Sequence, residues 1–183
     1  MKYIALIFIL TPIFAHASHN PMFAHGTRNS IGIYATQSTG HGDLGHLVAP
    51  WEWDITPMTS VILQYSQPIT FLRLPSRINI HAVQNFAYNS ARGASFGALG
   101  ISLDTLIFSK CGFYIGIGIG PYMRDSADQY VASRLVFGEK VFIGKNITPQ
   151  TRAEIFTLHF SNGDFTEPNH GFNFAGLGFN YSF

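Results

Sequence analysis

A strict alternation of apolar residues with small or polar residues recurs along most of this chain. In residues 112–120, Phe or Ile occupies every second position, and Tyr or Gly lies between them. Residues 175–183 repeat the pattern, with Ala, Leu, Phe and Tyr alternating with Gly, Asn and Ser. Successive side chains of a β-strand point to opposite faces, so these segments predict strands with one apolar face.

The composition of the second face separates two architectures that share this alternation. The outer face of a soluble β-sandwich is rich in Lys, Glu and Thr, whereas here it holds mainly Gly, Ser and Asn. Charged residues make up 11% of the chain, less than half of the roughly 25% usual in soluble domains. An apolar face toward lipid, a small polar interior and a sheet closed on itself fit a membrane barrel. The prediction is an all-β protein, an eight-stranded antiparallel transmembrane β-barrel.

Eight segments carry the expected strands. They span residues 30–37, 46–56, 76–88, 94–108, 112–122, 133–145, 149–161 and 171–183. Several exceed the roughly 9–11 residues that a tilted strand needs to cross a bilayer. Residues 57–74 fit least well, because Pro68 lies within them and Pro75 directly follows them. Residues 61–65 could form a short strand, and we interpret the segment as a turn plus an extension of a neighbouring strand.

The first seventeen residues follow the plan of a secretory signal peptide. A basic start at Lys2 precedes an apolar stretch, and Ala15-His16-Ala17 is a small-x-small cleavage signal. The predicted domains are therefore a cleaved signal peptide, residues 1–17, and an outer-membrane barrel, residues 18–183. The terminal Phe183 with alternating aromatic residues before it is typical of bacterial outer-membrane barrels.

Charge and cysteine content narrow the function further. A formal net charge of +1 offers no broad basic surface, so no nucleic acid partner is expected. The single cysteine, Cys111, excludes an intramolecular disulfide and is interpreted as a small buried or lipid-facing residue and not as a reactive thiol. Eight strands leave an interior that side chains fill, which argues against an aqueous pore.

The residues with the clearest chemical potential lie in the seventh predicted strand. His159 and Ser161 are two positions apart, so both side chains project from the same face, the lipid side. An imidazole that accepts a hydroxyl proton and a serine that attacks an ester carbonyl would suit an esterase acting on lipid. A His-x-Ser pair alone is also compatible with polar residues at the rim of a barrel.

The mature chain resembles the lipid A 3-O-deacylases, outer-membrane barrels that cleave the 3-position acyl ester of lipid A. The resemblance includes His159-x-Ser161-Asn162, then Pro168-Asn169, then Gly171 before the last strand, and it extends to Trp51-Glu52-Trp53-Asp54 and residues 112–120. It implies that Ser161 is the nucleophile and His159 the general base. Asn169 and Asn162 would position or stabilise the oxyanion. The family uses neither metal nor cofactor.

One position departs from the family pattern. The third catalytic member of the family is a glutamate on the last strand, and Asn173 occupies the matching position here. Its parity places it on the same face as His159. An asparagine accepts a hydrogen bond from an imidazole N–H, as in papain-like enzymes, but carries no charge to stabilise an imidazolium. Asp164 or Glu167 in the preceding loop could supply that charge.

Other polar residues have plainer interpretations. His159, Asp164, Glu167 and His170 lack a recognised ligand spacing, so no metal site is predicted. The acidic residues of the strands are expected inside the barrel, paired with basic side chains: Glu52, Asp54, Asp104 and Glu154 with Arg77, Arg134, Arg152 or His81.

The sequence thus predicts an outer-membrane serine esterase whose partner is lipid A or lipopolysaccharide in the outer leaflet, with a homodimer left open. Two alternatives remain: a barrel of the same descent that has lost catalysis, and a structural or adhesive barrel whose loops bind a partner.

Overall fold

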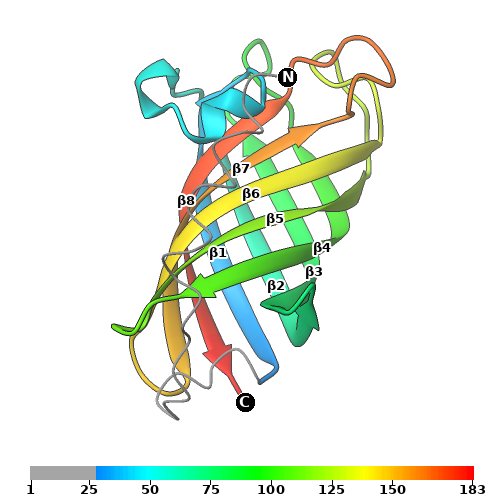
Figure 1. Cartoon of the computed structure of the whole chain (residues 1–183). Coiled ribbons are helices and arrows are strands. Elements are labelled where there is room, and N and C mark those ends of the chain that lie inside the picture. Colours follow the sequence, from blue (N-terminus) through cyan, green and yellow to red (C-terminus); the bar gives the residue numbers. More distant parts are fainter. Residues whose placement is uncertain (1–27) are drawn as a thin grey trace.

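The computed structural model describes residues 28–183, which form one closed barrel of eight antiparallel strands (Figure 1). Consecutive strands pair in order, and β1 pairs with β8 to close the sheet. The predicted fold class is confirmed for this part of the chain. The predicted signal peptide, residues 1–17, lies outside the described residues. The barrel closes with the strands of one chain. This closure gives no support to the homodimer that the sequence left open.

The strands are long, as a tilted membrane-crossing strand must be. They are β1 (Ser30–Gly40), β2 (Met58–Phe71), β3 (Leu74–Ala87), β4 (Phe96–Phe108), β5 (Phe113–Arg124), β6 (Leu135–Asn146), β7 (Thr151–Ser161) and β8 (Phe172–Ser182). Seven of them match the predicted segments to within a few residues.

The predicted strand at residues 46–56 is wrong. This segment forms two short 3₁₀ helices, η3 (Leu44–Leu47) and η4 (Pro50–Glu52), and the strand lies in the next segment as β2. Pro50 begins η4, where its missing N–H costs nothing. Leu72 and Arg73 form the two-residue turn into β3, both with positive φ, which is the geometry that a tight hairpin needs.

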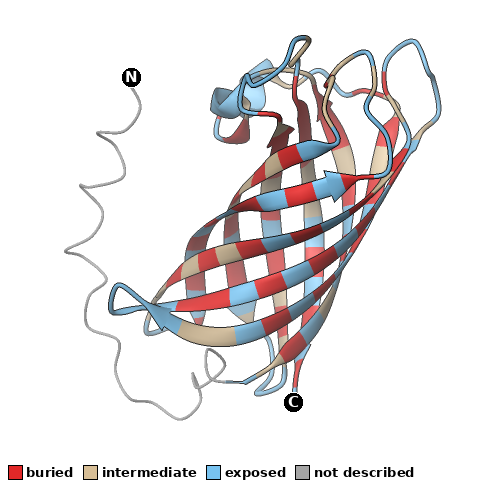
Figure 2. Cartoon of the chain, turned by 90° about the vertical axis from the view of Figure 1, so that its right-hand side faces the viewer, coloured by how far each residue is buried: buried red, intermediate tan, exposed pale blue. Residues whose placement is uncertain are grey.

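The predicted alternation of inward and outward side chains is confirmed along the strands (Figure 2). In β5, every second residue is buried inside the barrel, and the isoleucines between them are exposed on its outer wall. Every strand carries exposed large apolar residues on its outward face, so an apolar belt surrounds the barrel. No helix within residues 28–183 has the length and apolarity to cross a membrane.

The two ends of the barrel differ in the length of their connections. Residues 72–73, 109–112 and 147–150 form short turns at one end, where the C-terminus also lies. The other end carries the long connections, residues 41–57, 88–95, 125–134 and 162–171 (Figure 1). We call these the short-turn end and the long-loop end.

A buried ionic cluster fills the middle of the barrel. Arg77 bridges Asp104 (2.8 Å) and Glu154 (2.7 Å), and Lys140 also contacts Asp104 at 2.8 Å. The hydroxyl group of Tyr34 donates to Glu154 as well. The prediction that Asp104 and Glu154 pair with basic residues inside the barrel is confirmed, because each buried charge has an opposite partner.

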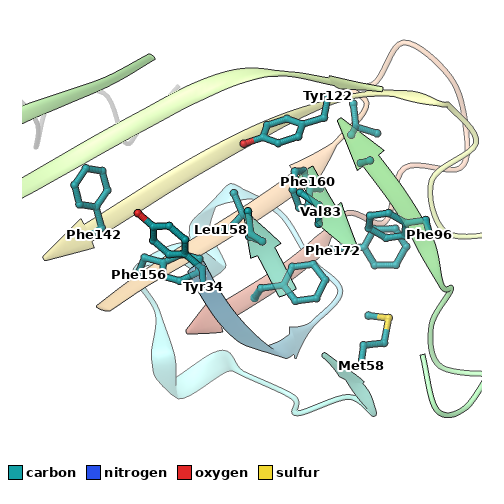
Figure 3. Close-up of a cluster of buried hydrophobic side chains, with 14 of the residues drawn as sticks. Tyr34, Met58, Val83, Phe96, Tyr122, Phe142, Phe156, Leu158, Phe160 and Phe172 are labelled. Carbon is teal, nitrogen blue, oxygen red and sulfur yellow. The ribbon is translucent and has the colours of Figure 1, made fainter. Parts of the chain in front are cut away.

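Buried apolar side chains pack along much of the barrel interior (Figure 3), and one part of this cluster lies toward the long-loop end. Met58, Phe96, Phe160 and Phe172 all lie at strand ends on that side, and each is at most 2% exposed. The rings of Phe96 and Phe160 meet edge to face at 6.4 Å between centroids, a favoured aromatic geometry. This packing closes the interior and makes the strand ends a rigid base for the loops.

Candidate active site

His159 projects outward from β7, yet it is almost fully buried. Ile155, on the same outward face four residues earlier, is 67% exposed, whereas His159 is 4% exposed. The cover comes from the β1–β2 loop, residues 41–57, whose helix η3 packs against β6, β7 and β8. Thr157, two residues before His159, donates its hydroxyl to the Leu47 carbonyl at 2.9 Å. The loop therefore lies on the outer wall of the barrel, over the histidine.

Asn173 and His159 face each other across the β7–β8 pair. The two residues are direct partners in the register, and His159 Nδ1 lies 2.8 Å from Asn173 Oδ1. On the other side of the amide, Asn173 Nδ2 donates to the Gly42 carbonyl at 3.3 Å. A carbonyl oxygen only accepts, so the amide nitrogen must face Gly42 and the amide oxygen must face His159. The histidine proton then sits on Nδ1, and Nε2 is left as a base.

Backbone hydrogen bonds tie three loops together around this pair. Gly42 N–H donates to the His170 carbonyl at 2.9 Å, and His170 N–H donates to the Tyr130 carbonyl at 2.7 Å. The His41 ring stacks on Tyr130, with centroids 4.3 Å apart, and its Nδ1 lies 2.8 Å from the Gly171 carbonyl. The orientation of Asn173 is thus set by the β1–β2, β5–β6 and β7–β8 loops together.

Gly171 allows the β1–β2 loop to approach the histidine. Its φ is +64°, a left-handed conformation that favours glycine. A Cβ atom at this position would lie 2.6 Å from the Gly42 carbonyl oxygen and 2.6 Å from His159 Cε1. Any other residue would therefore displace the loop, the imidazole or both.

Ser161, the predicted nucleophile, is the last residue of β7 and is half-buried. It lies directly opposite Phe137 of β6 and projects to the same outward side as His159. No hydrogen bond joins Ser161 to His159, since two residues of a strand separate them by roughly 6.6 Å of backbone. Contacts between a nucleophile and its base are often long before substrate binds.

The two asparagines of the predicted oxyanion site brace the β7–β8 loop. Asn162, 1% exposed, donates its amide Nδ2 to both Thr166 O and Thr166 Oγ1, at 2.7 and 2.8 Å. Both of its amide protons are therefore used. Asn169 Oδ1 accepts from the Asn162 backbone N–H, and its Nδ2 donates once, to Asp164 at 2.6 Å. One N–H of Asn169 remains free to donate.

None of the four acidic side chains considered in the sequence for these loops reaches His159. Asp164 contacts Asn169, and Glu167 is exposed in the same loop; neither has a hydrogen bond to His159. Glu52 and Asp54 were expected inside the barrel, and that prediction is wrong: both are exposed in the β1–β2 loop, where Asp54 pairs with Arg92 at 3.0 Å. Within residues 28–183, His, Cys, Asp and Glu form no group of three that could hold a metal ion.

A family model matches most of this chain. The model describes lipid A 3-O-deacylases (PagL) and matches residues 35–182, which include all of the site residues above. The chain belongs to the lipid A 3-O-deacylase family. Together with the closed barrel and its apolar belt, this membership places the protein in the outer membrane, with the short turns in the periplasm and the long loops outside the cell.

Individual relatives agree with this assignment. The lipid A deacylase PagL of Bordetella bronchiseptica is 36% identical over 74 residues, which are 39% of this chain and 42% of the relative. The match thus spans less than half of the relative. The crystal structure of the outer membrane enzyme PagL has a TM-score of 0.56 at 15% identity, and it covers 83% of this chain and 99% of that one. Neisserial surface protein A gives a TM-score of 0.57 at 10% identity, covering 85% and 97% of the two chains. These two structures share the fold.

Sequence reasoning did not identify the contribution of the β1–β2 loop in this lipid A 3-O-deacylase family member. Gly42 acts through its carbonyl oxygen, which no side-chain motif reveals. Its position over β8 depends on how a loop between β1 and β2 folds across the closing seam of the barrel. The only local sequence signal of a close backbone approach was Gly42 itself, between His41 and Asp43.

Proposed function

We propose that this protein hydrolyses the 3-O acyl ester of lipid A, with Ser161 as nucleophile and His159 as general base. The observation that carries the proposal is the 2.8 Å contact between His159 Nδ1 and Asn173 Oδ1 on the outward face of the barrel. That contact leaves Nε2 unprotonated, on the same outward face of the barrel as Ser161. Family membership supports the reaction type.

In the first step, the Ser161 hydroxyl attacks the ester carbonyl carbon and its proton passes to His159 Nε2. The imidazolium keeps its Nδ1–H bonded to Asn173 Oδ1, so the ring does not rotate while it holds the proton. The negative charge on the former carbonyl oxygen is stabilised by hydrogen-bond donors of the β7–β8 loop. The free N–H of Asn169 suits this role, and Asn162 fixes the loop that presents it.

Collapse of the tetrahedral intermediate expels the sugar alkoxide, which takes the proton from His159 Nε2. A water molecule then attacks the acyl-serine, with His159 again accepting the proton, and the fatty acid leaves. The partner of the protein in this scheme is lipid A in the outer leaflet, next to the exposed side of the site. No step requires a metal or a cofactor.

Mass spectrometry of lipid A from cells with and without this protein tests the proposal. Wild-type protein should remove the 3-linked acyl chain, and Ser161→Ala and His159→Asn should each abolish the change. Matched controls are Ser133→Ala and His170→Asn, a serine and a histidine in loops of the same end. Full activity of Ser161→Ala would show that the nucleophile is wrong.

A second candidate is a barrel that retains the fold without catalysis. It is favoured by Asn173, which replaces the glutamate of the family, and by the equally close fold of Neisserial surface protein A. Unchanged lipid A with wild-type protein that is folded and heat-modifiable on gels would support this candidate.

A further inference from the structure

The β1–β2 loop has two faces. Its inner face orients Asn173, and its outer face is exposed rather than packed against the barrel within residues 28–183. The loop descends along the outer wall of the barrel rather than across its mouth. Its lowest anchor is the Leu47 carbonyl on Thr157, four residues below the end of β7, or roughly 13 Å along the strand. Leu47 and Ala49 are buried against the barrel. In Figure 1 the two short helices project sideways from the barrel wall.

The outer face of this loop carries a group of exposed apolar side chains, beside the exposed carboxylate of Glu52. Four side chains are each more than half exposed: Leu44, Val48, Trp51 and Ile55, at 53, 64, 79 and 57%. Four exposed large apolar side chains within twelve residues of one loop are a feature of interaction sites on folded proteins. Two of the three acidic residues of the loop are engaged locally, since Asp43 caps η3 and Asp54 pairs with Arg92.

The patch continues a surface that already faces lipid. Ile155 and Leu177 are paired neighbours on β7 and β8, 67 and 55% exposed in the apolar belt. They lie four residues from His159 and Asn173, toward the periplasm, and the loop occupies the adjoining stretch of the same outer wall. Where that wall lies within the bilayer, a segment that replaces lipid on it meets lipid with its far side.

We infer that the β1–β2 loop is embedded in the outer leaflet, with Leu44, Val48, Trp51 and Ile55 among the lipid acyl chains. Tryptophan is favoured at the boundary between headgroups and acyl chains, which suits Trp51. The loop thereby separates the imidazole of His159 from bulk lipid, while Ser161 at the strand end stays accessible. The inference depends on the barrel and its loop, and not on the proposed hydrolysis.

Fluorescence quenching tests it directly, because the chain contains two tryptophans. Trp53→Phe leaves Trp51 as the probe, and Trp51→Phe leaves Trp53, whose Nε1 donates to the His46 carbonyl. Each variant of the full mature chain is placed in vesicles of phosphatidylcholine brominated at shallow or deep acyl positions. Trp51 should lose most of its emission, more with shallow than with deep bromines, and acrylamide in the water should quench it little. Trp53 should respond less to the bromines.

A second variant shows that the patch is responsible. Leu44→Glu with Val48→Glu, in the Trp53→Phe background, should lift Trp51 out of the leaflet, so that bromine quenching is lost and acrylamide quenching rises. Leu72→Glu, an exposed leucine in a periplasmic turn, is the matched control and should change neither. Strong acrylamide quenching of Trp51 without bromine quenching would overturn the inference, because the loop would then stand in water. Protection from both quenchers would also overturn it, since protein would then cover the patch.

Discussion

Replacing Asn173 by alanine should slow lipid A deacylation without unfolding the barrel. The change removes the acceptor for His159 Nδ1–H and the donor for the Gly42 carbonyl, in a site where Asn173 is 1% exposed. A buried donor left without a partner costs about 1–3 kcal/mol. Because each 1.36 kcal/mol is a factor of ten in rate, kcat should fall about 5- to 160-fold. KM should change less, since Asn173 contacts the base and not the lipid.

Asn173→Asp should have the opposite effect. The aspartate has the same size and keeps an acceptor near His159 Nδ1, and its charge stabilises the imidazolium that forms during catalysis. Two unit charges about 4 Å apart interact by roughly 4 kcal/mol at an effective dielectric constant of about 20. The second carboxylate oxygen would face the Gly42 carbonyl oxygen, and because both are acceptors this contact is lost at a cost of about 1–3 kcal/mol. The net gain of about 1–3 kcal/mol should raise kcat about 5- to 160-fold, below the roughly 10⁴ measured for the acid of a serine triad.

Asn173→Glu, the residue of the family, should gain less than Asn173→Asp. Its extra methylene must fit between His159 and Gly42, and overpacking of a filled site costs about 1–3 kcal/mol. The assay is release of 3-hydroxy fatty acid from lipopolysaccharide in mixed micelles. Asn146→Ala is the control, because its amide atoms have no hydrogen bonds and it lies at the periplasmic end of β6. Wild-type kcat in Asn173→Ala would refute the orienting role. Loss of activity in Asn173→Asp would show that the bond to Gly42 outweighs the charge.

Three further outcomes follow from the geometry. Gly171→Ala and Gly163→Ala both place alanine at positive φ, +64° and +66° respectively. Only Gly171→Ala puts a Cβ atom within 2.6 Å of His159, so it alone should lower kcat tenfold or more in the micelle assay. Arg77→Met should lower the free energy of unfolding in urea by about 3–5 kcal/mol, because the buried Glu154 then loses its main basic partner. The control Arg73→Met should leave the free energy of unfolding unchanged. Thr157→Val should release the β1–β2 loop from the Leu47 carbonyl and lower kcat several-fold, whereas Thr157→Ser keeps the hydroxyl and should keep the wild-type kcat. An unchanged kcat in Thr157→Val would mean that this anchor is dispensable.

The alternation of side chains was enough to predict a closed barrel, and it failed in one segment for a physical reason. Residues 47–55 alternate as well as a true strand does, but Pro50 interrupts them, and the apolar residues there serve the loop surface instead. In β2 the interior residues include Ile62 and the exterior ones Val61 and Leu63, so the run of apolar side chains hid the period of two. The turn at Leu72 and Arg73 carries no glycine or asparagine, so no turn signal marked the hairpin.

The placement of His159, Ser161 and Asn173 on one outward face also followed from parity, because strand geometry fixes which side chains share a face. The burial of His159 could not follow from it. That burial comes from the β1–β2 loop, and which strands a loop covers depends on the order in which the sheet closes. The uses of Asn162 and Asn169 as loop braces likewise depend on contacts within a ten-residue connection that has no periodicity.

The β1–β2 loop would let an amide orient His159 at position 173, where the family resemblance implies a carboxylate. A carboxylate at position 173 would orient the histidine by charge and would need no partner behind it. An amide has two different ends, and it orients the histidine only if something holds its nitrogen away from the ring. The Gly42 carbonyl supplies that restraint, and Gly171 supplies the space for it. The side chain at position 173 and the carbonyl group at position 42 therefore orient the histidine together, so the contribution of either group depends on the other.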